Sequence, residues 1–301
     1  MKLRIVTNTN EQCGNYQYAV HLIKELRKHF EDVGVYDSHE TMPDVMIWNW
    51  HPAVVSTSAE RVKQVKAQGV KTVLILQNSH DMPVAVGPDD ILAVSDVVIA
   101  HEPMCSNVRI EYIPHGIPDD VNLQTSWVRA VGTAGFLFPW KRPDVVVEAA
   151  RRAGVPARIV CPPYGNLIDP DKLMASMGPG DIEYWSGFLP EDKVIQILSG
   201  NALNIFWFES RGMDDRLGQT GSARMGFASQ RPVIISRHRK FRTIIEEFDD
   251  EVYIADSERE VYQFTNEILE NLDRAKRPKR MIEQQGWSKV GEMYANIIRS
   301  L

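Results

Sequence analysis

Short apolar runs alternate along the chain with segments in which apolar residues recur at helical spacing. In residues 16–29, for example, Ala19, Leu22 and Leu26 fall on one face of a helix. This rhythm is typical of a parallel α/β sheet in which strands and helices follow one another. In the first half, the expected strands are 3–7, 45–48, 71–77, 96–100 and 110–113, and the expected helices are 16–29 and 58–68.

A second alternating series begins after the break at residues 114–120, which is rich in proline and glycine. Its expected strands are 130–135, 158–161, 182–185, 203–208 and 232–236, and its expected helices are 145–153 and 192–198. We therefore predict an α/β protein with two tandem Rossmann-like domains, over 1–122 and 128–280. In such proteins, ligands bind where the carboxyl ends of the strands face a cleft.

The composition is that of an ordinary globular protein. The 301 residues are 44% hydrophobic and 25% charged, and no apolar run reaches the roughly 18 residues that span a bilayer. The N-terminus reads as a strand and not as a signal peptide. The three cysteines are far apart in sequence, which favours reduced thiols and a cytoplasmic protein without zinc spacing.

Charge is distributed unevenly between the two halves. Residues 1–122 hold 10 Lys and Arg against 16 Asp and Glu, whereas residues 123–301 hold 24 of each. The first half therefore does not attract a polyanion in general. Two basic runs lie in the second half, at 237–242 and 274–280, and we interpret both as solvated surface.

Residues 218–236 carry the most informative pattern, which is a loop of small residues, a short helix, a turn closed by Pro232 and a buried strand. A helix start offers unpaired N–H groups and a positive dipole end, both of which favour an anion. The loop is thus a candidate phosphate site, and ordinary helix capping is the alternative. Its candidate residues are Gln219, Thr220, Gly221 and Ser222.

Three loops of the first half follow predicted strands. A polar loop with Gly14 and Asn15 opens a helix, and it is either a ligand loop, which we expect to bind the donor, or a long capped turn. His80 lies on a third loop, as a catalyst or as a structural hydrogen bonder. The second of these loops, at residues 48–51, offers aromatic and polar groups for a sugar or another ring, although Trp48 would pack in a core equally well. Its residues are Trp48, Asn49, Trp50 and His51.

The second half has further loops at strand ends. Lys141, between a strand and a helix, could neutralise a phosphate, or it could be an ordinary surface lysine. The bare backbone of Gly187, Phe188 and Leu189 suits contact with a flat ring. A charged loop offers carboxylates for hydroxyl groups, or is a solvated turn; its acidic candidates are Glu209, Asp214 and Asp215.

The order of these motifs resembles the retaining glycosyltransferases of family 4, and the resemblance covers nearly the whole chain. The matching segments are the glycine loop at 13–16, the interdomain signature "I-P-N-G-V-D" at 113–119, the "V-G-R-L…K-G…A" segment at 131–150, "A-x-G-x-P-V-I" at 228–234, and a terminal "W-…-Y" helix at 287–294.

The chain also departs from the family pattern. Phe136 stands where the family has an arginine beside its phosphate lysine, and Met225 and Leu217 stand where it has paired glutamates. In their place, Gln219 to Ser222 look like a variant of the family loop. Glu209, Asp214 or Asp215 are candidates for the lost carboxylate, and Arg142 is the candidate for the lost cation.

The resemblance implies the GT-B architecture, with an interdomain cleft and a C-terminal helix, 281–301, that packs back on the N-terminal domain. It also implies transfer of a sugar from a UDP- or GDP-type nucleotide diphosphate sugar, held by the C-terminal domain, with retention of configuration. The N-terminal domain would take an unknown acceptor, such as a saccharide, a small molecule or a modified nucleobase, with His80 near the reacting sugar.

Without clustered ligands we expect neither a metal nor any other cofactor. Three alternatives stay open from the sequence: a DNA-modifying glycosyltransferase of the phage type, a nucleotide-sugar epimerase of the same fold, and a catalytically weak sugar-nucleotide binder.

Overall fold

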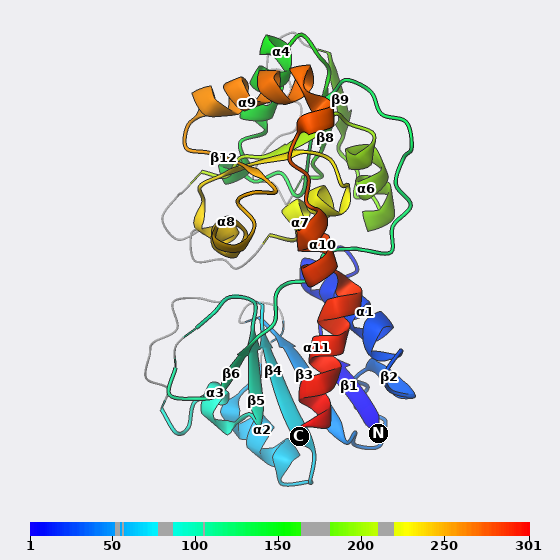
Figure 1. The fold of residues 1–301 in the computed structure, drawn as a ribbon. Coiled ribbons are helices and arrows are strands. Elements are labelled where there is room, and N and C mark those ends of the chain that lie inside the picture. The colour runs from blue at the N-terminus through cyan, green and yellow to red at the C-terminus, as the bar shows by residue number, and fades with distance from the viewer. Residues whose placement is uncertain (52–54, 56, 78–86, 105, 164–180, 210–219) are drawn as a thin grey trace. The chain divides into compact units, whose positions relative to one another are not determined.

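The computed structural model describes residues 1–51, 55, 57–77, 87–104, 106–163, 181–209 and 220–301. Two compact units make up this part of the chain, each built around a six-stranded parallel sheet (Figure 1). The first unit contains residues 1–116 and 287–301, and the second contains residues between 117 and 286.

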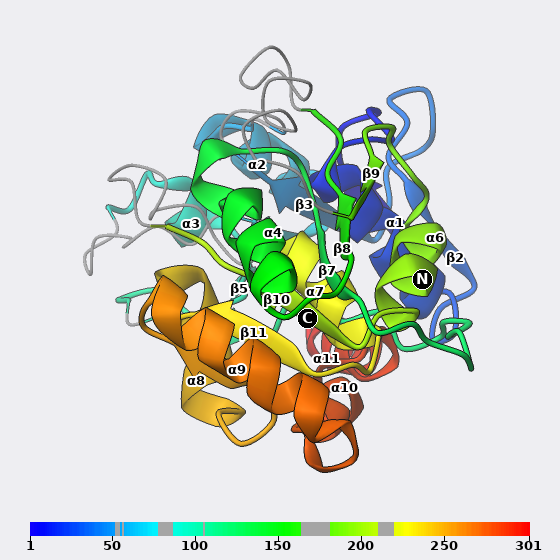
Figure 2. The same cartoon turned by 90° about the horizontal axis from the view of Figure 1, so that it is seen from above.

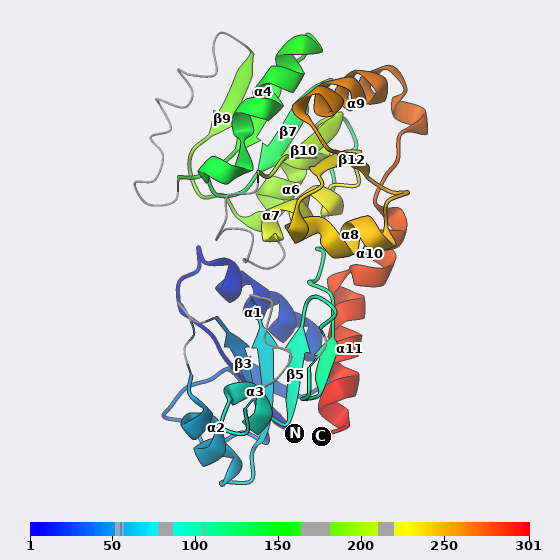
Figure 3. The same ribbon diagram turned by 90° about the vertical axis from the view of Figure 1, so that its left-hand side faces the viewer.

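The first sheet has the strand order β2-β1-β3-β4-β5-β6. Alternate residues of each strand enter two cores, so that Ile47 lies in the core under α1 and α11 while Met46 and Trp48 lie in the core under α2 and α3. Figure 3 shows α11, in red, alongside this sheet. The elements are β1 (Lys2–Val6), α1 (Gly14–Leu26), β2 (Asp32–Val35), β3 (Val45–Trp50), α2 (Ala59–Lys66), β4 (Lys71–Leu76), α3 (Ile91–Val94), β5 (Val97–Ala100), β6 (Ile110–Tyr112) and α11 (Trp287–Arg299).

The second sheet has the order β12-β11-β10-β7-β8-β9. When the strands of this unit are numbered one to six along the chain and the sheet is read from β9, the order is 3-2-1-4-5-6. This is the strand order of dinucleotide-binding folds. Helices α4 and α9 lie side by side on it (Figures 1 and 2). The elements are β7 (Val131–Ala134), α4 (Pro143–Arg152), β8 (Ala157–Val160), β9 (Ile182–Trp185), α6 (Glu191–Ser199), β10 (Leu203–Phe206), α7 (Gly221–Ala228), β11 (Val233–Ser236), α8 (Arg242–Glu247), β12 (Tyr253–Ala255), α9 (Glu258–Glu270) and α10 (Lys279–Gln285).

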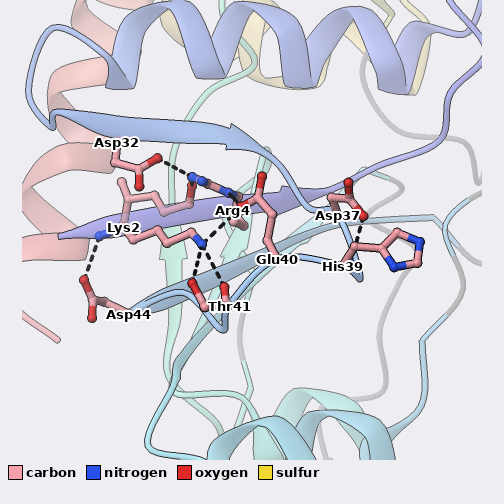
Figure 4. A network of polar contacts seen from close by, with 9 residues as sticks. Lys2, Arg4, Asp32, Asp37, His39, Glu40, Thr41 and Asp44 are labelled. Atoms are coloured by element: carbon pink, nitrogen blue, oxygen red, sulfur yellow. Dashed lines mark hydrogen bonds and ion pairs between the residues drawn. The ribbon is translucent and has the colours of Figure 1, made fainter.

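Edge strand β2 was not expected from the sequence, because Asp32–Val35 has no clear apolar pattern. Ion pairs hold it instead. Arg4, on β1, is only 8% exposed and binds Asp32 at 2.6 Å and Glu40 at 2.7 Å (Figure 4). Hydrogen bonds from Arg4 lower the pKa of both carboxyl groups. We therefore attribute the charged residues at this edge of the sheet to the pairing of β2 with β1.

The chain passes between the units at 116/117 and at 286/287, six residues before the predicted boundary in the first case. The predicted C-terminal helix is two helices, of which α10 belongs to the second unit and only α11 to the first. In the first unit, the hydroxyls of Tyr18 and Tyr294 hydrogen-bond at 2.7 Å and tie α11 to α1. Across the described residues, no helix is both long and apolar enough to cross a membrane.

Candidate functional site

The second sheet changes winding direction between β7 and β10, which are neighbours at its centre. The loops after these two strands must diverge there, and the opening at the carboxyl ends is where open α/β sheets bind their ligands. In this chain the loop after β7 carries Lys141, and the segment after β10 leads to the start of α7. Topology thus brings together two segments that are remote in sequence.

Lys141 meets the start of α7 directly. Its Nζ lies 3.3 Å from Ser222 Oγ, and Ser222 Oγ lies 2.9 Å from Thr220 Oγ1. The close approach depends on Gly135, whose φ of +118° suits glycine and whose missing Cβ would lie 2.6 Å from Lys141 Nζ. The Lys141 ammonium and the hydroxyl groups of Ser222 and Thr220 therefore lie close together.

The surroundings of Lys141 are apolar rather than acidic. Its Nζ lies between 5.4 and 5.8 Å from the ring centres of Phe138, Trp140 and Phe208. Burial is the main reason that the pKa of Lys141 falls to about 8. No carboxylate of the described residues forms an ion pair with it. A buried cation with aromatic and hydroxyl neighbours is suited to an anionic ligand.

The first turn of α7 has the features of an anion site. Thr220 precedes the helix, and its side chain bonds Ser222 rather than capping the backbone; the first turn holds no acidic residue. A Cβ added at Gly221 would meet no other atom within 4 Å. Open space therefore adjoins the N–H groups of the turn, next to the Lys141 ammonium.

Arg142 has the opposite environment. Its guanidinium binds Asp144 at 2.8 Å, Glu209 at 3.0 Å and Glu258 at 2.9 Å. Hydrogen bonds to Asp144 are the main cause of its raised pKa. With three carboxylates around it, Arg142 anchors the loop to α4 and α9, and its predicted role in place of a phosphate-binding arginine stays a prediction. Glu209, the candidate for the donor sugar, is one of these three carboxylates.

Aromatic residues adjoin the site at the ends of β7 and β9. The rings of Phe136 and Phe188 lie 6.2 Å apart with 30° between their planes, and Phe188 is 41% exposed. Leu189 packs on the core beneath, and a Cβ at Gly187 would meet open space. Phe136, at the position of the family arginine, thus belongs to an exposed aromatic surface that suits a flat ring.

The carboxyl edge of the first sheet has neutral polar groups. Asn49 is fully buried, donates to Thr7 Oγ1 at 3.3 Å and to the Asn15 carbonyl at 2.6 Å, and accepts from Gln77. The Asn15 Nδ2 is buried without a hydrogen-bond partner among the described residues. This edge therefore offers an amide donor beside Gly14, whose α-carbon faces open space.

Trp48 follows the core alternative that the sequence left open. It is 3% exposed and packs in the core against α2, because β3 runs on to Trp50 and places Trp48 inside the sheet. Trp48 and Asn49 are therefore buried, and Trp50 and His51 are the partly exposed residues of the predicted stacking loop. His80, Asp214, Asp215 and Gln219 lie outside the described residues.

Neither a family model nor a curated protein sequence matches this chain. Solved structures do. HepE from Anabaena, in complex with UDP, is similar over 100% of both chains, with a TM-score of 0.73 and 12% identity. A glycosyltransferase from Rickettsia africae covers 99% of this chain and 98% of its own, with a TM-score of 0.70 and 12% identity. AviGT4, a glycosyltransferase involved in avilamycin A biosynthesis, covers 99% of this chain and 97% of its own, with a TM-score of 0.65 and 12% identity.

The chain has the GT-B glycosyltransferase fold. The predicted fold class of tandem parallel sheets is thereby confirmed, whereas membership of family 4 stays a prediction.

Sequence reasoning missed one charged residue near this site of the GT-B fold. Lys240 was assigned to a solvated basic run, yet it is 7% exposed and lies over the Trp140 ring at 4.6 Å. The available signal was its place in the loop that follows a buried strand at the carboxyl edge. The other basic run does lie at the surface, where Lys276 and Arg280 bind backbone carbonyls.

Metal ligands do not cluster in the described parts of this GT-B fold. No group of three His, Cys, Asp or Glu side chains could hold an ion there.

Proposed function

We propose that this protein is a glycosyltransferase whose second unit binds a nucleotide diphosphate sugar, with UDP as the favoured nucleotide. The observation that carries the proposal is the meeting of Lys141, Ser222 and the first turn of α7 at the switch point of the second sheet. The fold supports it, and so does the UDP in the HepE complex.

The physical task of such a site is to stabilise the departing diphosphate. The bond between the anomeric carbon and the diphosphate oxygen breaks, and the acceptor oxygen bonds that carbon. The acceptor proton passes to a phosphate oxygen, as the family resemblance implies for a retaining transfer. Lys141, Ser222 and the N–H groups of α7 would stabilise the negative charge that develops.

We assign the remaining groups by position. Phe136 and Phe188 would contact the nucleobase, and Glu209, Asp214 and Asp215 stay candidates for the donor sugar. On the first unit, Trp50, His51 and His80 are the acceptor candidates. We reassign Asn15 from the donor to the acceptor, because its side-chain amide is buried without a described partner at this edge. Experiment has to identify the class of acceptor, which is a saccharide, a small molecule or a modified nucleobase.

A panel of UDP, GDP and their sugars tests the proposal. The thermal midpoint should rise with one nucleotide, since a ligand that binds only the folded state stabilises it. The matching sugar nucleotide should then release its nucleoside diphosphate when acceptors are added, equally well with EDTA. Restoration by magnesium after loss in EDTA would refute metal independence.

The outcomes separate the alternatives. Conversion of the donor sugar without an acceptor would indicate an epimerase, and binding without turnover would indicate a sugar-nucleotide binder. Transfer to duplex DNA would indicate a DNA-modifying enzyme. A panel in which no nucleotide diphosphate shifts the midpoint would contradict the proposed function.

A further inference from the structure

The loop after β11 folds part of its basic run inward. His238 is 3% exposed, and its Nδ1 accepts a hydrogen bond of 3.2 Å from the Lys240 N–H, which starts the short 3₁₀ helix Arg239–Phe241. Arg237, three positions earlier, is more than half exposed and binds Asp256 at 2.6 Å. Of the cations in this one loop, Lys240 is therefore buried and Arg237 is exposed.

The inward Lys240 reaches the same aromatic ring as Lys141. Its Nζ lies 4.6 Å from the centre of the Trp140 ring, and Lys141 Nζ lies 5.4 Å from that centre. Each lysine is held from a separate strand end, Lys141 after β7 and Lys240 after β11.

An aromatic scaffold fixes this arrangement. Phe208, after β10, contacts Trp140 edge to face at 5.0 Å and stacks on Phe241 at 5.0 Å. Phe241 directly follows Lys240, so the rings tie the three loops together. Both ammonium groups are therefore held near the Trp140 ring, and the charge of Lys240 acts on Lys141.

We propose that Lys240 is a second cationic ligand of the donor diphosphate, and that it sets the preference for a diphosphate over a monophosphate. This inference rests on the proposed function. A lone ammonium beside α7 accounts for one phosphate group, and a second one on the same indole is suited to the next. Position 136, where the family pattern has an arginine, is phenylalanine in this chain, so that position supplies no second cation.

The charge balance agrees with this assignment. Burial is the main cause of the lowered pKa of Lys141, and the positive charge of Lys240 lowers it further. An anion with several charges between or beside the two groups would remove that repulsion, and a singly bound phosphate would do so less completely.

The test is calorimetric titration of the whole chain with UDP and with UMP. Lys240→Gln and Lys240→Met remove the charge, Lys240→Arg keeps it, and Arg237→Gln is the matched control that removes an outward charge from the same loop. Thermal melting of each variant verifies folding, and the Met variant keeps the apolar stem over Trp140 if the Gln variant does not fold.

Both neutral variants should lose about 10-fold or more in UDP affinity, the scale of one charge-assisted hydrogen bond, and at most about twofold in UMP affinity. The Arg variant should recover part of the UDP affinity, and the control should bind both ligands as the wild type does. Equal losses for UDP and UMP, or no loss for either, would overturn the inference.

The same titration distinguishes this inference from the proposed function. If the wild type binds UDP and Lys141→Gln weakens that binding while the Lys240 variants do not, only the role of Lys240 is wrong. If the wild type binds no nucleoside diphosphate, the proposed function fails as well.

Discussion

The carboxyl edges of the two sheets differ in the charge that they leave available. In the second unit, Lys141 lies beside hydroxyl groups and a helix start, and no described carboxylate pairs with it. In the first unit, the corresponding edge holds the uncharged amides of Asn49 and Asn15, of which Asn49 donates to Thr7 and to the Asn15 carbonyl and accepts from Gln77. An ammonium group without a described acidic partner thus lies at one edge, and hydrogen-bonded uncharged groups lie at the other.

Adjacent residues show the same contrast within one loop. Lys141 and Arg142 are both cations, yet only Arg142 is surrounded by acids. Arg142 adopts a left-handed conformation with φ 41° at the start of α4, and its guanidinium binds Asp144 on α4 and Glu258 on α9. Charge alone therefore does not identify a ligand site, and the partners of the charge do.

The largest effect should come from filling the space at Gly221. Gly221→Val would place a branched side chain where the structure leaves nothing within 4 Å, so folding should be kept and UDP binding should fall below detection. Calorimetry and thermal melting measure the two quantities. Gly221→Ala provides a graded control with a smaller loss, and a Val variant that binds UDP normally would remove the phosphate from this turn.

A second prediction sets Lys141 against Arg142. Lys141→Gln should weaken UDP binding by about 1.5–3 kcal/mol, or roughly 10- to 150-fold, the range for a hydrogen bond to a charged group. Arg142→Gln removes one charge from the next position and should change UDP affinity by at most about twofold. Equal effects in the two variants would break the contrast on which the site is built.

The pH dependence of binding follows from the lowered pKa of Lys141. The free protein loses the Lys141 proton as the pH rises through about 8, and UDP favours the protonated form. Affinity should therefore decline above about pH 8, by at most tenfold per pH unit, whereas Lys141→Gln should lack this decline. A wild-type affinity that stays level up to pH 10 would contradict the assignment.

The stability of the free protein should show the opposite sign. Because the folded-state pKa is below the unfolded value of 10.5, the unfolded chain binds more protons between about pH 8 and 10.5. The contribution of Lys141 to the free energy of unfolding thus rises with pH over that window. The difference between wild type and Lys141→Gln isolates this contribution from those of other groups.

The smallest effect on the ligand should come from the first edge. Asn49→Ala removes the partner of Gln77 and of the Asn15 carbonyl, so unfolding should become about 1–3 kcal/mol easier while UDP affinity stays unchanged. Chemical denaturation and calorimetry measure both. Asn296→Ala, on an exposed helix face, serves as the control. A loss of UDP affinity without a loss of stability would place the nucleotide at this edge instead.

The apolar pattern predicted most strands, and the partly exposed edge strand Ile182–Trp185 has the bounds expected from the sequence. Edge strand β2 was missed because Asp32–Val35 has no clear apolar pattern, and β12 was missed although Tyr253–Ala255 is a short apolar run. Lys141 and the α7 loop were each expected to bind phosphate. Their joint action on a diphosphate was expected from the order of the motifs, but the contact between them was not, because 81 positions separate Lys141 from Ser222 and only the strand order joins them.

The sequence also did not show which of these side chains are buried. Trp48 at a strand end and Lys240 in a basic run have local patterns that fit exposed surface as well as interior. Packing against α2 decides the first, and the aromatic scaffold around Trp140 decides the second. Both depend on segments that are distant along the chain.

A crystal structure with UDP tests the central claim most directly. The account predicts diphosphate oxygens within hydrogen-bond distance of Lys141 Nζ, Ser222 Oγ and the first N–H groups of α7, at the carboxyl edge of the second sheet. Nucleotide bound at the edge of the first sheet beside Asn15, with Lys141 still bonded only to Ser222, would contradict it.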